Sequence, residues 1–284
     1  MSRIVYLNGS YLPEQEAKIS IFDRAVNFGD AIYEVAGVMQ GKLVDFEHHM
    51  QRYQTSLGKL SMQSPLQKDE ILAAFRQLVA VNEIENGLVY MQLTRGVAER
   101  DFDWPEGMQP NLFMFTQPQS AAEAEQAGSG LKLASVDDIR WARRDIKTVN
   151  LLGQVLAKRQ AHEAGADEAL MVDRDGFVTE CASSSFFIVS GDSILTRPLN
   201  NDILPGVTRR AVLALCQQQG MQLLERKFTL EEAMKADEAF ITAASAYLMA
   251  VVKIDDRDVG AGKPGPTHKK LLDLYLQEIK ASLL

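Results

Sequence analysis

The sequence has few cysteines and no long apolar run. Its 284 residues include only two cysteines, Cys181 and Cys216, too few for the disulfide framework of a small secreted domain. No apolar stretch approaches the ~20 residues that a membrane-spanning helix needs. Residues 1–6 lack the apolar core of a secretion signal and are expected to form a strand. We therefore expect a cytoplasmic protein without a membrane partner.

An excess of positive charge is also absent. Lys and Arg number 30 against 38 Asp and Glu, so the formal net charge is −8. This balance argues against nucleic acid as the main partner, although a locally basic site for a small anion remains compatible with it. The histidines show no metal-site spacing, because His48 and His49 lack a third ligand, and we expect no metal.

Turn signals and apolar periodicity predict an α+β fold. Asn8-Gly9 and Gln40-Gly41 each separate two short apolar runs and predict β-hairpins. The stretch 117–130 is small, polar and ends in glycine, which favours a linker. We expect two α+β domains: a small N-terminal α/β domain at 1–118, a linker at 119–130, and a larger C-terminal, cofactor-binding domain at 131–284.

Helical spacing and short apolar runs place the elements within these domains. We expect helices at 46–60, 67–82, about 149–164, 207–219, 230–235 and 267–281. We expect strands at 31–39, 89–94, 112–115, 131–136, 168–172, 177–180, 185–189 and 240–242.

Lys147 is the first candidate for chemistry. Arg140, Arg143 and Arg144 precede it closely, and cationic neighbours or burial can lower the pKa of a lysine toward nucleophilic use. The same residues would also suit a solvated basic loop leading into a helix. Composition alone favours the solvated loop.

Two further segments could bind a ligand. Pro205-Gly206 precedes a predicted helix, and Thr208 adds a hydroxyl in its first turn, which is an arrangement that can hold a phosphate. Glu180 ends a short predicted strand before the hydroxyl-rich residues 183–185, where a carboxylate could serve a ring nitrogen. Taken alone, the first segment is better interpreted as an ordinary helix cap and the second as a surface turn.

In chain order, these segments resemble the fold-type IV pyridoxal phosphate enzymes, and most closely their D-amino acid aminotransferases. The family also includes branched-chain and (R)-amine aminotransferases and aminodeoxychorismate lyase. The resemblance covers nearly the whole chain and rests on five motifs: Phe28–Val35 (FGDAIYEV), Glu47–Arg52 (EHHMQR), Asp145–Gly153 (DIKTVNLLG), Thr179-Glu180, and Ile203–Arg209 (ILPGVTR).

The resemblance implies pyridoxal 5'-phosphate as cofactor and assigns roles to these residues. Lys147 matches the lysine that forms the Schiff base and moves the proton, and Glu180 matches the carboxylate that pairs with the pyridine nitrogen. Leu204 matches the apolar residue that supports the ring. Arg52 matches a phosphate ligand, as do Val207 and Thr208 at a helix N-terminus.

Two positions depart from the closest pattern. Ala244 stands where a phosphate-binding threonine is common, so backbone amides and Ser245 are expected to replace that contact. The resemblance also places Tyr33, Val35 and Arg100 in the substrate site. However, Phe102 stands where a histidine completes the carboxylate-binding set, and the expected set is therefore partial.

We thus expect a homodimeric transaminase that acts on a D-amino acid, such as D-alanine, and a 2-oxo acid. Within the family, the alternatives are an (R)-amine or branched-chain aminotransferase and an aminodeoxychorismate lyase. Outside it, they are a phosphate-binding or cofactor-carrying protein without turnover, and a structural α+β protein whose lysine is incidental.

Overall fold

The computed structural model describes residues 2–119 and 128–283. Its described residues form two compact units. Unit 1 contains 2–119, 146–150 and 282–283, and unit 2 contains 128–145 and 151–281. Of the expected linker at 119–130, residues 120–127 lie outside the described residues. Within the described ranges, no helix combines the length and apolar character needed to cross a membrane.

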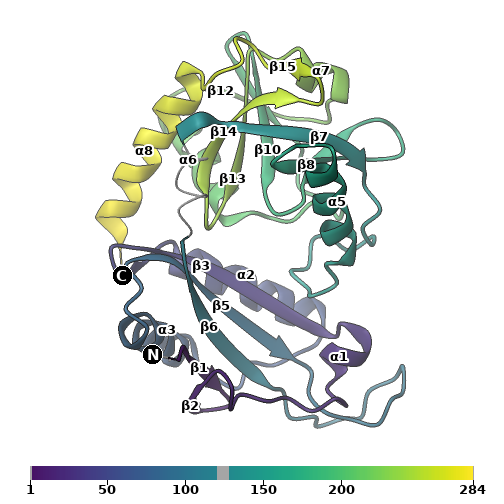
Figure 1. Cartoon of the computed structure of the whole chain (residues 1–284), viewed down its shortest axis with the longest axis vertical. Helices are drawn as coiled ribbons and strands as arrows, with labels where there is room; N and C mark the ends of the chain where they lie inside the picture. Colours follow the sequence, from purple (N-terminus) through teal and green to yellow (C-terminus); the bar gives the residue numbers. More distant parts are fainter. Residues whose placement is uncertain (1, 120–127, 284) are drawn as a thin grey trace. The chain divides into compact units, whose positions relative to one another are not determined.

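Unit 1 is built on a six-stranded antiparallel sheet with the strand order β2-β1-β6-β5-β3-β4 (Figure 1). Its strands are β1 (Ile4–Leu7), β2 (Ser10–Pro13), β3 (Ala31–Met39), β4 (Lys42–Leu43), β5 (Asn86–Thr94) and β6 (Leu112–Pro118). Its helices are α1 (Arg24–Phe28), α2 (Phe46–Lys59) and α3 (Lys68–Val81). The longest pairing in this sheet joins β3 to β5.

The turns and helices of unit 1 follow from local sequence. Asn8 and Gly9 both have positive φ, at 48° and 94°, in the hairpin between β1 and β2. Gln40 and Gly41 also have positive φ, in the hairpin between β3 and β4. Both predicted hairpins are therefore confirmed. On α2, the buried positions repeat at helical spacing and join the core of the unit. These α2 positions are Phe46, Met50, Tyr53 and Leu57.

Residues 146–150 extend unit 1 from a distant part of the sequence. Ile146 is buried in the hydrophobic core of the unit. Thr148 forms an isolated antiparallel bridge with Ile32, and the Val149 amide donates to the Ala31 carbonyl over 3.2 Å. The helix expected from about 149 therefore begins later, at Leu152, because the preceding residues pair with β3.

Unit 2 contains a nine-stranded mixed sheet in the order β12-β11-β10-β13-β14-β7-β8-β9, with β15 paired to β14. Its strands are β7 (Leu131–Asp137), β8 (Glu168–Val172), β9 (Val178–Cys181), β10 (Ser185–Ser190), β11 (Ser193–Thr196), β12 (Gln222–Glu225), β13 (Glu238–Ala243), β14 (Tyr247–Ile254) and β15 (Arg257–Asp258). The strands β7, β8, β9, β10 and β13 confirm those expected from periodicity.

The helices that accompany this sheet over residues 131–282 are α5 (Leu152–Glu163), α6 (Val207–Gln218), α7 (Leu230–Met234) and α8 (Pro266–Ser282). Apolar residues from β7, β8, β10, β13 and β14 form the largest buried cluster of the unit. On β13, alternate residues point to opposite faces, so Ile241 joins this cluster while Phe240 stacks on Phe187 at 4.9 Å. The ends of β9 and β13 and the start of α6 carry most of the unit 2 residues singled out in the sequence.

Candidate active site

Lys147 is fixed in unit 1 by both its backbone and its side chain. Its carbonyl accepts a hydrogen bond from the Tyr33 amide over 3.0 Å, and its amide donates to Ser56 Oγ on α2 over 3.3 Å. Its Nζ lies 3.9 Å from the centroid of the Tyr33 ring. This cation–π contact places the amine on the sheet face that carries Tyr33.

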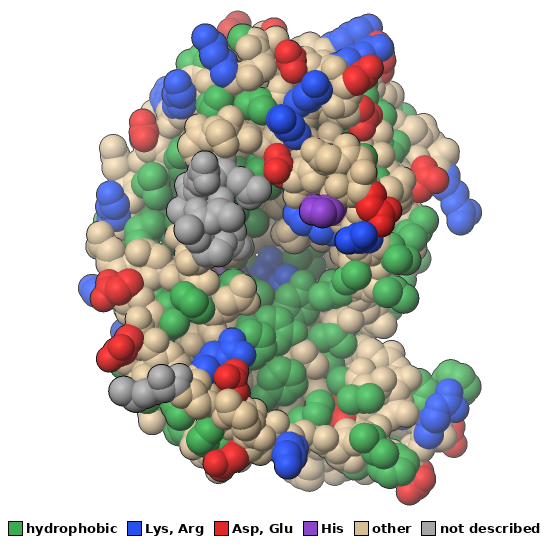
Figure 2. All heavy atoms as spheres, viewed as in Figure 1, with side chains coloured by type: hydrophobic (Ala, Val, Ile, Leu, Met, Phe, Trp, Pro, Cys, Tyr) green, Lys and Arg blue, Asp and Glu red, His purple; other side chains and the backbone are tan. Residues whose placement is uncertain are grey.

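That face of the sheet is aromatic. Tyr33 stacks on Tyr90 of β5 with 5.5 Å between ring centroids, and Tyr90 stacks on Phe115 of β6 at 4.7 Å. Val35, two residues after Tyr33, points to the same face and is half-buried. Figure 2 shows hydrophobic side chains gathered over these strands. This face therefore presents stacked aromatic rings beside the Lys147 amine.

Glu34 points to the opposite face of β3, toward α2, and pairs with Arg52. The Glu34 carboxylate accepts from Arg52 Nε and Nη2, both over 2.8 Å, and lies 2.9 Å from His49 Nδ1. Glu34 and His49 are buried, and the Arg52 side chain is only 9% exposed. The guanidinium expected to bind phosphate is thus held in one orientation by a forked ion pair.

The charges of this cluster follow from burial and pairing. Burial acts to raise the pKa of Glu34, but the charge and hydrogen bonds of Arg52, helped by His49, outweigh it and bring that pKa down to about 2. Burial also lowers the pKa of His49. Near pH 7 we therefore expect an ionised Glu34 and a neutral His49 that donates from Nδ1 to the carboxylate.

Arg100 lies in the connection between β5 and β6, outside any strand or helix. Its guanidinium lies 5.4 Å from the Phe28 ring centroid and 5.7 Å from that of Phe102. Phe102 is 79% exposed. The residue that interrupts the expected carboxylate-binding set is therefore a surface aromatic that packs beside Arg100.

Glu180 is the centre of a charged network in unit 2. It lies on β9, is 5% exposed, and accepts hydrogen bonds from Arg140 Nη1 and from the Leu204 amide. The Leu204 amide lies 3.2 Å and 3.3 Å from the two carboxylate oxygens. Arg140 also pairs with Asp138, which in turn accepts from Thr179 Oγ1 over 2.7 Å. The network holds Glu180 and the backbone of Leu204 together.

The two carboxyl groups of this network differ in their pKa. Burial raises the pKa of Glu180, although Arg140 and the Leu204 amide act against it. Burial also acts to raise the pKa of Asp138, but the hydrogen bonds and charge of Arg140 outweigh it and leave that pKa lowered. Glu180 is consequently the group whose charge would gain most from a cationic partner.

The three arginines before Lys147 all pair with carboxylates of unit 2. Arg140 pairs with Asp138 and Glu180, Arg143 with Asp145, and Arg144 with Asp138 and Asp202. Their positive charges are therefore balanced locally.

The start of α6 packs closely against Ser185 of β10. Gly206 precedes the helix and makes no side-chain cap, and a Cβ at this position would lie 2.8 Å from Ser185 Oγ. Thr208 is 2% exposed, and its Oγ1 has no hydrogen-bond partner among the described residues. A buried hydroxyl without a partner at a helix N-terminus is unusual and suits an anionic ligand.

Ala244 and Ser245 lie in the turn between β13 and β14. Ser245 is exposed, and Tyr247, which follows the turn, has a φ of 54°. Thr242, at the end of β13, is 3% exposed, and its Oγ1 also lacks a partner among the described residues. Unit 2 therefore places Glu180 against the Leu204 amide, and α6 begins three residues after Leu204 with Val207 and Thr208. The Ser245 side chain lies on a surface turn.

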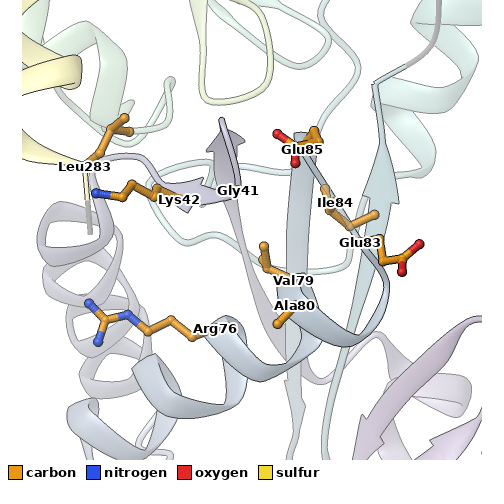
Figure 3. Close-up of a pocket in the computed structure, with 9 residues that line it drawn as sticks. All are labelled: Gly41, Lys42, Arg76, Val79, Ala80, Glu83, Ile84, Glu85 and Leu283. Carbon is orange, nitrogen blue, oxygen red and sulfur yellow. The ribbon is translucent and has the colours of Figure 1, made fainter.

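A groove of about 670 Å³ in unit 1 contains none of the candidate residues. Figure 3 shows Lys42, Arg76 and Leu283 on one side of it, and Glu83 and Glu85 on the other. Its mixed charges and open position give no sign of the expected chemistry.

Sequence reasoning missed the residues that hold the candidates in place. Glu34 and His49 were not identified, although a lone acid in the alternating pattern of β3 and a histidine three residues before Arg52 were available signals. The sequence places Arg140 close before Lys147, whereas in the structure the Arg140 guanidinium donates to Glu180. Ser56 carried no signal in the sequence, because its contact with Lys147 spans 91 residues.

Comparison with known proteins identifies relatives along nearly the whole chain. The family model for class IV amino-transferases matches residues 31–254. The D-alanine aminotransferase of Bacillus licheniformis is 36% identical over 267 residues, covering 94% of each chain, and that of Staphylococcus haemolyticus is 36% identical over 277 residues, covering 98% of each.

Solved structures with a similar fold include two branched-chain amino acid aminotransferases. The Escherichia coli enzyme superposes with a TM-score of 0.92 at 22% identity and covers 98% of this chain and 95% of its own. The Thermobaculum terrenum enzyme, solved in its PLP-form, has a TM-score of 0.85 at 23% identity and covers 99% of this chain and 94% of its own. At these identities the likeness shows the fold.

Proposed function

The chain belongs to the class IV aminotransferases, and we propose that it uses pyridoxal 5'-phosphate to exchange an amino group between a D-amino acid, such as D-alanine, and a 2-oxo acid. The observation that carries the proposed substrate is its similarity to D-alanine aminotransferases over nearly its full length. The family match bears out the resemblance inferred from the five motifs and identifies the chain as an aminotransferase.

The residues present fit a phosphorylated pyridine cofactor. Thr208 presents a buried hydroxyl without a described partner at an α6 N-terminus that has no side-chain cap. Gly206 allows this helix start to lie against Ser185, where a Cβ would require the Ser185 hydroxyl to shift. Val207 and Thr208, with Arg52, would hold the phosphate, and Glu180 would face the ring nitrogen beside Leu204.

When bound, the cofactor supplies an electron sink for the carbanion formed at the substrate Cα. Lys147 Nζ would attach the cofactor and carry the proton to and from that carbon, and its contact with Tyr33 orients the amine. Glu180, whose pKa burial raises, would share a proton with the ring nitrogen and gain a cationic partner. Arg140 and the Leu204 amide hold the carboxyl group for that contact.

On the substrate side, Tyr33, Val35 and Arg100 would contact the amino acid. Arg100 supplies the cation for its carboxylate, and Phe102 adds an apolar surface instead of a second polar contact. The Ala244–Ser245 turn would contribute backbone amides to the phosphate, a role in which the exposed Ser245 hydroxyl is secondary.

The proposal is tested by the absorbance of the purified holoenzyme after D-alanine, L-leucine or (R)-1-phenylethylamine is added separately. Rapid conversion of the bound cofactor with D-alanine, followed by recovery with 2-oxoglutarate, is the expected result. Conversion by L-leucine alone would contradict the D-amino acid assignment and favour a branched-chain enzyme, whose solved examples share this fold. Conversion by the amine alone would favour an (R)-amine aminotransferase.

The same preparation separates the two remaining alternatives. Release of pyruvate and 4-aminobenzoate from aminodeoxychorismate, without a 2-oxo acid acceptor, would favour the lyase. A spectrum that stays unchanged with every donor would favour a cofactor-carrying protein without turnover.

The proposed assembly is a cytoplasmic homodimer. Seven large apolar side chains in the described part of unit 2 are more than a third exposed, and five of them lie between residues 139 and 156, which is typical of a surface that a partner covers. The five are Ile139, Trp141, Leu152, Val155 and Leu156. Both cysteines are free and buried, which suits a reducing compartment. Sedimentation of the holoenzyme and cell fractionation test these two parts of the proposal separately.

A further inference from the structure

Arg24 binds the backbone of the loop that carries Arg100 and Phe102. Its guanidinium donates to three consecutive carbonyls: those of Asp101 and Asp103 from Nη1, over 2.7 Å and 3.0 Å, and that of Phe102 from Nη2, over 3.2 Å. Arg24 is only 3% exposed. A planar fork of donors fits this task, and a lysine could not reproduce it.

Asp30 joins Arg24 to a second arginine. Its Oδ2 accepts from Arg24 Nε over 2.9 Å and from Arg95 Nε over 2.7 Å. Arg95 also donates from Nη2 to the Leu60 carbonyl over 2.9 Å, and its guanidinium lies 4.1 Å from the Trp104 ring centroid. The Asp30 carboxylate thus balances two adjacent guanidinium groups. We call Asp30, Arg24 and Arg95 together the Asp30 clamp.

The clamped loop has little other support. Residues 99–107 are exposed, and a cavity of about 490 Å³ is lined by residues 61–65 and 104–110 together with Arg95. Because the loop buries little apolar surface, its conformation depends on the polar contacts that hold its backbone.

The same clamp sets the position of the Arg100 side chain. Arg24 lies 4.6 Å from the Phe28 ring centroid, and Phe28 packs on Phe102 at 5.6 Å. Arg100 lies against both rings. The Arg95 amide donates to the Asp30 carbonyl over 3.1 Å, at the start of the strand that carries Tyr33.

We propose that the Asp30 clamp positions Arg100 for recognition of the substrate carboxylate and Phe102 as the apolar surface beside it, so that Asp30, Arg24 and Arg95 are positioning residues for specificity. This inference rests on the proposed function. Loss of the clamp leaves the chemistry at Lys147 in place and removes the preferred orientation of the substrate. It therefore raises KM more than it lowers kcat.

The test compares Asp30→Asn and Arg24→Lys holoenzymes with the wild type. Steady-state kinetics with D-alanine and 2-oxoglutarate should show KM raised about 10-fold and kcat changed less than about 2-fold. Limited trypsin digestion, read by mass spectrometry, should show faster cleavage after Arg100 in both variants. Glu47→Gln, which breaks the exposed pair of Glu47 with Lys68, is the matched control and should leave both measurements unchanged.

Unchanged KM and unchanged cleavage after Arg100 in either folded variant would overturn the inference, as would a fall in kcat alone. If Asp30→Asn does not fold, Arg24→Lys decides, because it keeps a cation beside Asp30 and loses only the fork. Unfolding of both variants would make the clamp a folding element and would also overturn it. A wild type without transaminase activity would instead refute the proposed function, and the trypsin result would then still report on the clamp.

Discussion

Among single residues, Lys147 has backbone contacts that do not depend on the charge of its side chain. Its backbone is anchored by Tyr33 and Ser56, and only Nζ reaches the Tyr33 ring. Removing the amine should therefore leave the local structure intact. The lysine is available for chemistry because its neighbours already satisfy its backbone.

Lys147→Ala should abolish covalent attachment of pyridoxal phosphate and lower transaminase activity at least about 100-fold, the lower range for loss of a positioned acid–base group. Borohydride reduction followed by mass spectrometry measures the attachment. Lys42→Ala, at an exposed strand position, is the control. Borohydride-stable labelling that persists in Lys147→Ala would show that another amine holds the cofactor.

Glu34 connects stability with pH. Its pKa is about 2, below its ordinary value of 4.5, so its stabilising effect is fully present above pH 4.5 and is lost as the pH falls toward 2. Glu34→Gln should reduce the free energy of unfolding by about 3 kcal/mol at pH 7, because it removes the buried carboxylate that pairs with Arg52. Urea unfolding at pH 7, 5 and 3.5 measures the effect.

The difference in unfolding free energy between wild type and Glu34→Gln should be constant from pH 7 to 5 and become smaller below pH 4.5. Glu47→Gln, in an exposed pair, should show almost no difference at any pH. If this difference in unfolding free energy stayed constant down to pH 3.5, the pKa assigned to Glu34 would be contradicted. We also expect weaker binding of pyridoxal phosphate to Glu34→Gln, because Arg52 loses its orientation.

At the scale of elements, residues 146–150 show how a short segment is docked on a strand. Asn150 Nδ2 donates to the Gly29 carbonyl over 3.2 Å, just before β3 begins. Gly29 has a φ of 67°, and a Cβ there would lie 2.5 Å from Asn150 Oδ1. The glycine of the Phe28–Val35 motif is thus required by backbone conformation and by close approach together.

Gly29→Ala and Gly41→Ala form a matched pair for this element. Both positions have positive φ, but a Cβ at Gly41 meets only the Ile84 carbonyl oxygen at 4.0 Å. Gly41→Ala should cost about 1 kcal/mol of unfolding free energy from conformation alone. Gly29→Ala should cost about 1–3 kcal/mol more, because Asn150 must move. If both variants lost the same unfolding free energy in thermal or urea unfolding, the close approach of Gly29 to Asn150 would make no contribution to stability.

At the scale of the whole molecule, the exposed apolar side chains of α5 suggest a covered surface. Leu152 is 70% exposed and Val155 is 59% exposed. The double variant Leu152→Asp/Val155→Asp should shift the holoenzyme from dimer to monomer, because charge in an apolar interface is costly to desolvate. Analytical ultracentrifugation measures the change.

Val81→Asp is the control for this experiment, since Val81 is 51% exposed on α3 and lies outside that surface. It should leave the assembly unchanged. A wild type that sediments as a monomer would contradict the proposed homodimer directly. A dimer that resists the double substitution would place the interface elsewhere.

Much of the secondary structure could be predicted, because it depends on neighbouring residues. The Asn8-Gly9 and Gln40-Gly41 hairpins and the buried stripe of α2 require only local backbone preferences and a 3.6-residue period. The start of α5 could not be predicted, since the pairing of Thr148 with Ile32 outweighs the helical periodicity there. No local pattern reports a contact across more than a hundred residues.

By itself, the sequence determined the family and the order of its motifs, because each motif is a short run of residue types whose chemistry can be recognised along the chain. Only the tertiary structure decided what each charged group pairs with. It placed Arg140 on Glu180, Glu34 on Arg52, and Lys147 beside Tyr33. The physical reason is that Coulombic and cation–π contacts depend on distance in space, and folding sets that distance independently of separation in sequence.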